Sequence, residues 1–86
     1  MTSEHIQLRS VVDGTDVIAD DSEIFDYVDD FLTERGLEYE FVREEESDFR
    51  RFYVMHFGVD VPLETIMGVL AGISIETVDG IWRLNN

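Results

Sequence analysis

The acidic residues of this chain crowd into its first half, and this uneven distribution limits which segments can enter a core. Residues 1–48 carry 16 Asp and Glu residues against 3 Arg, whereas residues 49–86 carry 4 against 3. The whole 86-residue chain has a formal net charge of −14, and all six of its basic residues are Arg. Because a buried charge needs a partner, the core must come from the apolar positions between these acids.

A net charge of this size also excludes some classes of function. It repels the phosphates of DNA, RNA and anionic lipid, so we expect no direct binding to nucleic acid or to a membrane. The chain has no Cys, which removes disulfides, thiolate metal sites and cysteine nucleophiles. No apolar run approaches the roughly 18 residues of a membrane span, and residues 1–9 do not resemble a signal peptide. We therefore expect one cytoplasmic domain that spans residues 1–86.

Two helices are predicted from apolar spacing and from end signals. In residues 22–35 the apolar side chains recur on one helical face, after an acidic capping sequence at residues 20–23 and before Gly36. A second helix is predicted over residues 62–71, because Pro62 suits the first turn of a helix.

Alternating apolar residues predict strands around these helices. Residues 44–48 are expected to form a solvated loop, and the Asp-Gly pairs at 13–14 and 79–80 suit either hairpin turns or bulges. The strands are expected over residues 5–12, 37–43, 50–57 and 73–78. We predict an α+β fold of the ferredoxin-like β-α-β-β-α-β type, a two-layer sandwich with an antiparallel sheet and two helices on one face. A sheet with extra hairpins at both Asp-Gly pairs is the main alternative.

Acidic side chains are spaced to line up along the exposed side of the first predicted helix. Residues three or four apart stack along one stripe, about 5–6 Å from each other, which is the scale of successive phosphates on a nucleic-acid strand. Like charges at this spacing destabilise a helix, so folding stability alone would not select them. The predicted partner-binding residues are Glu23, Asp26, Asp30, Glu34, Glu38, Glu40, Glu44, Glu45, Glu46 and, as an aromatic anchor, Phe49.

These features predict a non-enzymatic acidic binding protein. We expect it to imitate nucleic-acid phosphates and to occupy the basic groove of a nucleic-acid-handling protein as an inhibitor. In kind, though without a shared motif, such a protein is similar to phage-encoded inhibitors of restriction or CRISPR systems. One alternative is a salt-adapted regulatory or dimerisation domain, because an acid-rich composition without Lys is typical of proteins from salt-loving organisms. The other alternative is a small-ligand-binding domain of ferredoxin-like type.

Patterns for catalysis and metal binding are weak. No nucleotide-binding glycine loop or serine-hydrolase motif occurs, and His56 lies inside the best strand signal, where a structural role is expected. The acids around Asp13 and Asp16 do not have the spacing of a calcium loop. We therefore predict no catalytic residue, no cofactor and no metal site. The second predicted helix has little polar surface, which favours either burial or a contact with a second copy or a docked partner through Met67, Val69 and Leu70.

Overall fold

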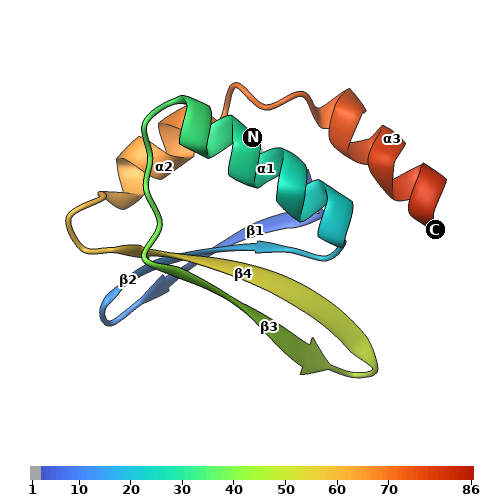
Figure 1. Cartoon of the computed structure of the whole chain (residues 1–86), viewed down its shortest axis with the longest axis horizontal. Helices are drawn as coiled ribbons and strands as arrows, with labels where there is room; N and C mark the ends of the chain where they lie inside the picture. Colours follow the sequence, from blue (N-terminus) through green and yellow to red (C-terminus); the bar gives the residue numbers. More distant parts are fainter. Residues whose placement is uncertain (1–2) are drawn as a thin grey trace.

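The computed structural model describes residues 3–86 and is organised around a four-stranded antiparallel sheet. The sheet has the order β1-β2-β4-β3, and three helices lie on one of its faces (Figure 1). The strands are β1 (Ile6–Val11), β2 (Gly14–Ala19), β3 (Phe41–Ser47) and β4 (Arg50–Gly58). The helices are α1 (Ser22–Glu34), α2 (Leu63–Leu70) and α3 (Ile75–Asn85).

The chain is built from two β-hairpins, each followed by helix, rather than from the predicted β-α-β units. β1 pairs with β2, and β3 pairs with β4, so both hairpins are formed by neighbours in sequence. The two hairpins join through β2 and β4, which run antiparallel at the centre of the sheet. The α+β class is confirmed, but the strand order and the third helix match the ferredoxin-like pattern only loosely.

The largest departure from the prediction is α3, which replaces the strand expected over residues 73–78. Ser74 caps this helix, because its side chain accepts a hydrogen bond from the backbone N–H three residues further on. Val78 and Trp82 then lie one helical turn apart and pack toward the core. Gly80 lies within the helix, so the alternative hairpin at the second Asp-Gly pair is also wrong.

Both hairpins turn through two residues. At the first, Gly14 begins β2 with a φ of 149°, and a Cβ on it would collide with the carbonyl oxygen of Phe57 on β4. At the second, Asp48 and Phe49 have φ values of 53° and 64°, in the left-handed region that non-glycine residues rarely occupy. Because this turn is so short, the acids of residues 44–46 belong to β3, and the predicted loop there is wrong.

The core lies between the helices and the sheet. Asp21, within the predicted capping sequence, caps α1 by accepting hydrogen bonds from the backbone N–H groups of Glu23 and Ile24. The buried face of α1 comprises Ile24, Val28 and Leu32, which pack with residues of β2, β4, α2 and α3. Leu70 of α2 is fully buried in the same core, so this residue is not available for docking.

The other two docking candidates lie closer to solvent. Met67 is 52% exposed, and Val69 is partly buried against the core. No single helix in residues 3–86 is long and apolar enough to cross a membrane. The helices α2 and α3 reach that length and hydropathy only as a joined pair, which is bent by 78° at the break.

Candidate functional site

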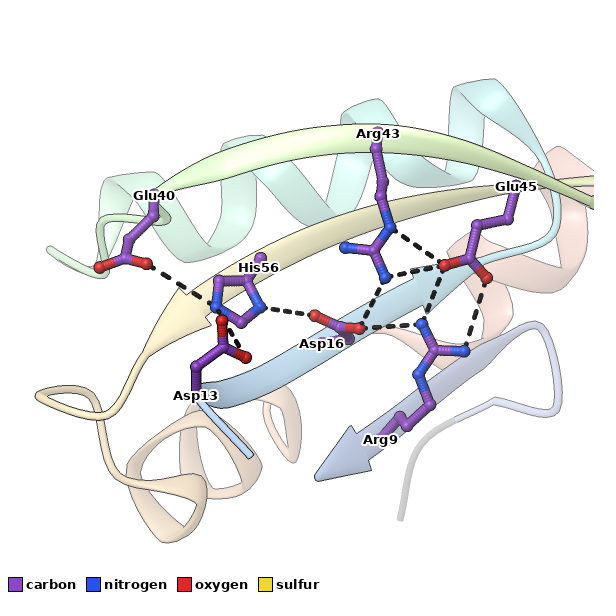
Figure 2. A network of polar contacts seen from close by, with 7 residues as sticks. All are labelled: Arg9, Asp13, Asp16, Glu40, Arg43, Glu45 and His56. Atoms are coloured by element: carbon purple, nitrogen blue, oxygen red, sulfur yellow. Dashed lines mark hydrogen bonds and ion pairs between the residues drawn. The ribbon is translucent and has the colours of Figure 1, made fainter. Parts of the chain in front are cut away.

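The sheet face away from the helices carries a charged network (Figure 2). Strand register builds it, because Arg9 on β1 lies opposite Asp16 on β2, and Asp16 lies opposite His56 on β4. Directly opposed residues in a sheet project to the same side, so these three side chains share one face. From β3, Phe41 lies opposite His56 and extends the same row.

Asp16 is the centre of the network and is only 1% exposed. Its Oδ1 atom lies 2.7 Å from Nδ1 of His56, and its Oδ2 atom accepts hydrogen bonds from Arg9 at 2.8 Å and from Arg43 at 3.0 Å. Burial by itself raises the pKa of Asp16, but the hydrogen bonds from these three groups outweigh burial and hold the pKa below its ordinary value. Asp16 is therefore a buried, ionised carboxylate.

Glu45 of β3 closes the network on its solvent side. One of its oxygens lies 3.0 Å from a guanidinium nitrogen of Arg9 and 2.7 Å from one of Arg43. Hydrogen bonds from the two arginines lower the pKa of Glu45, and the bonds to Glu45 and Asp16 raise the pKa of both arginines. Each arginine is thus shared between a buried carboxylate and a more exposed one.

His56 is 2% exposed, and its ring stacks on Phe41 with 4.7 Å between centroids. The hydrogen bond with Asp16 raises the pKa of His56, while burial lowers it, and the net shift is upward. Its second nitrogen, Nε2, is buried and makes no hydrogen bond within residues 3–86. This nitrogen lies 3.7 Å from Oε1 of Glu40 and 3.9 Å from Oδ1 of Asp13 (Figure 2).

The predicted partner-binding acids divide between the two sides of the molecule. On the outer side of α1, four exposed acids make no side-chain hydrogen bond or ion pair with any described residue. They are Glu23, Asp26, Asp30 and Glu34. By contrast, Glu40 and Glu45 belong to the network on the far face of the sheet. The structure therefore brings the α1 acids together as one stripe and separates them from these two.

The remaining predicted residues lie around β3. Glu44 and Glu46 point to the opposite side of this strand from Glu45, because side chains alternate along a strand. Both pair with Arg51 of β4, at 3.3 and 2.6 Å. The exposed Glu38 lies in the connection between α1 and β3, and the fully exposed Phe49 lies at the tip of the second hairpin.

Charge is segregated between the two layers of the fold. The three helices carry eight acidic residues and one Arg, whereas the four strands carry four acidic residues and four Arg. All four strand arginines form ion pairs; they are Arg9, Arg43, Arg50 and Arg51. The sheet thus neutralises its own acids, and the excess negative charge lies on the helices and the loops.

Sequence reasoning missed the network of Asp16, His56 and the two arginines. The available signal was a polar residue next to or inside an apolar run, since Asp16 precedes three apolar residues and His56 lies between Met55 and Phe57.

The structure also contains a hollow of about 140 Å³ beside β1, lined in part by Asp20 and Arg50. With the side chains as they stand in the described residues, no group of three or more His, Asp or Glu residues could hold a metal ion.

The chain was compared with known proteins. It matches no protein-family model, no curated protein and no solved structure.

Proposed function

We propose that this chain is a non-enzymatic binding protein whose helix α1 binds a basic surface on a partner protein. The observation that carries the proposal is the stripe of four uncompensated acids on α1, next to a sheet whose acids and arginines balance. Like charges three or four residues apart destabilise a helix by a few tenths of a kcal/mol for each pair. A partner with Arg and Lys side chains would remove that repulsion on binding.

The partner class that fits best is a protein that handles nucleic acid. Helical neighbours in the stripe are about 4.5–6 Å apart along the axis, so their carboxylates form a regular line of negative charge, as phosphates do along a nucleic-acid strand, where the axial spacing is about 3.4 Å. Carboxylates docked in a basic groove would displace phosphates from it, and the chain would act as an inhibitor by competition. Long-range attraction would speed the encounter, and added salt would weaken it.

The test compares two triple variants that remove the same charge from different surfaces. The first replaces the stripe, with Asp26→Asn, Asp30→Asn and Glu34→Gln. The second is the matched control, with Asp48→Asn, Glu64→Gln and Glu76→Gln, three exposed acids elsewhere. Partners are first isolated from the native host with the immobilised chain, and their affinities for both variants are measured at low and physiological salt.

We expect the stripe variant to bind at least tenfold more weakly, which is a loss of about 1.4 kcal/mol of binding free energy, while the control variant loses much less. Equal losses would show that only the total charge matters. Unchanged affinity for the stripe variant at low salt would rule out α1 as the binding surface.

A salt-adapted domain is the second candidate. On α2 and α3, the exposed Glu64 and Glu76 also have no cationic partner in the described part of the chain, and the sequence has no Lys. Unfolding temperature measured against KCl concentration separates the two. A salt-adapted domain should unfold well below molar KCl, since its self-repulsion needs screening. An inhibitor that acts at ordinary ionic strength should remain folded there.

A further inference from the structure

The hydrogen bond with Asp16 engages Nδ1 of His56 and leaves Nε2 as the nitrogen available to a ligand. Asp16 is an ionised acceptor held by Arg9 and Arg43, and it lies 2.7 Å from Nδ1 of the ring. An ionised carboxylate can only accept, so Nδ1 carries the proton of this hydrogen bond. In the neutral ring the lone pair is then on Nε2. A carboxylate that orients an imidazole through its other nitrogen is the usual support of a metal-binding histidine.

The surroundings of Nε2 favour a positive charge at this position. This atom is buried, lacks a hydrogen-bond partner within residues 3–86, and faces the carboxylates of Glu40 and Asp13 at 3.7 and 3.9 Å (Figure 2). Two carboxylates cannot satisfy a lone pair, because all three groups are acceptors. Either a proton on Nε2 or a cation between the three groups resolves this conflict.

We propose that His56, Asp13 and Glu40 form a binding site for a divalent transition-metal cation, at the end of the sheet where the β1–β2 turn and the segment before β3 meet β4. Zn²⁺ holds nitrogen and oxygen ligands at about 2.0–2.2 Å, which places tetrahedral ligand atoms roughly 3.3 Å apart. Each carboxylate therefore needs to approach Nε2 by about half an ångström. The side chains of Asp13 and Glu40 are 74% and 59% exposed, so they are free to make this movement.

Gly58 leaves room for a third carboxylate. A Cβ on this glycine would lie 2.6 Å from Oε2 of Glu40 and 2.9 Å from Oδ1 of Asp60, so both carboxylates lie against the backbone of Gly58. Asp60 therefore lies beside Glu40, at the edge of the proposed site. One imidazole with two carboxylates suits Zn²⁺ or Co²⁺, whereas Ca²⁺ and Mg²⁺ are held by oxygen ligands. No local sequence pattern indicates this site, because its residues are far apart along the chain.

The test is calorimetric titration of the EDTA-treated and desalted full chain with Zn²⁺ at neutral pH. Asp13→Asn and Glu40→Gln change exposed side chains and should leave the fold intact, and we expect each to weaken Zn²⁺ binding at least tenfold. Gly58→Ala should weaken it as well, by displacing the carboxylates above it. Glu38→Gln is the matched control, since it removes the same charge from a nearby exposed acid that pairs with no other residue described by the structure, and binding should be unchanged.

A second measurement identifies the ligand atom. On Zn²⁺ addition the ¹⁵N resonance of Nε2 in His56 should shift, and Co²⁺ should give visible absorption bands that Zn²⁺ displaces. The proposal is overturned if the wild-type chain shows no saturable binding, if Glu38→Gln weakens binding as much as Glu40→Gln, or if Nε2 does not respond. The α1 stripe variant should keep its Zn²⁺ affinity, so this inference and the proposed function fail separately.

Discussion

Replacing Asp16 with Asn tests whether the network on the outer sheet face stabilises the fold. Asn preserves the shape of the side chain but removes the charge that three donors share. Arg9 and Arg43 are 42% and 37% exposed and can turn to Glu45 and water, so the loss of each contact should contribute under about 1 kcal/mol. His56 is 2% exposed, and its charge-assisted hydrogen bond is worth about 1.5–3 kcal/mol.

The sum of these contributions predicts that Asp16→Asn lowers the free energy of unfolding by about 3 kcal/mol, at the lower end of the range for breaking a buried ion pair. Urea unfolding followed by the fluorescence of Trp82 measures it. This is the single Trp of the chain, and it stacks on His5 with 4.4 Å between ring centroids, so unfolding changes its surroundings.

Asp30→Asn is the matched control, because Asp30 is exposed and makes no side-chain contact with a cation among residues 3–86. Its effect should stay within about 0.5 kcal/mol. If Asp16→Asn destabilises the protein by less than about 1 kcal/mol, the network does not stabilise the fold, and the reasoning from burial is refuted.

Three further predictions use the same unfolding assay. The lowered pKa of Asp16 and the raised pKa of His56 mean that their mutual stabilisation is complete between about pH 4 and pH 6.5. In EDTA, the difference in unfolding free energy between wild type and Asp16→Asn should shrink as pH falls below that window or rises above it, and a constant difference from pH 3 to pH 9 would contradict this. Phe49→Gly should raise the free energy of unfolding by about 1 kcal/mol, because it relieves a left-handed φ of 64° at a fully exposed side chain. A lower free energy of unfolding would show instead that the Phe49 ring makes stabilising contacts. Gly14→Ala should lower stability by more than about 1 kcal/mol, since its Cβ would meet the carbonyl oxygen of Phe57, and a neutral result would refute that contact.

Elements with strong local signals were predicted closely. The helix expected over residues 22–35 is α1, and the strand expected over residues 50–57 is β4. The bounds of α1 follow from local signals, namely the apolar spacing, an acidic cap and Gly36, whose φ of 83° suits the end of a helix. Each of these signals spans only one or two helical turns. Such signals can be read without knowing any tertiary contact.

The C-terminal region could not be predicted in this way, because its alternating residues suit both a strand and a helix. Packing against α1 decides between them. As a helix, α3 buries Val78 in the core, and the backbone N–H of Ser74 donates to the hydroxyl of Tyr27 on α1. These contacts join residues about fifty positions apart, so no local pattern contains them.

The sequence by itself determined the excess of negative charge, its concentration in the first 48 residues, and the line of acids along α1. Only the tertiary structure decided which acids have partners, by bringing Arg9, Asp16, Glu45 and His56 onto one face of the sheet. The reason is that helical spacing is a local property of the chain. Electrostatic pairing and pKa depend instead on distance through space and on burial, and both follow from strand register.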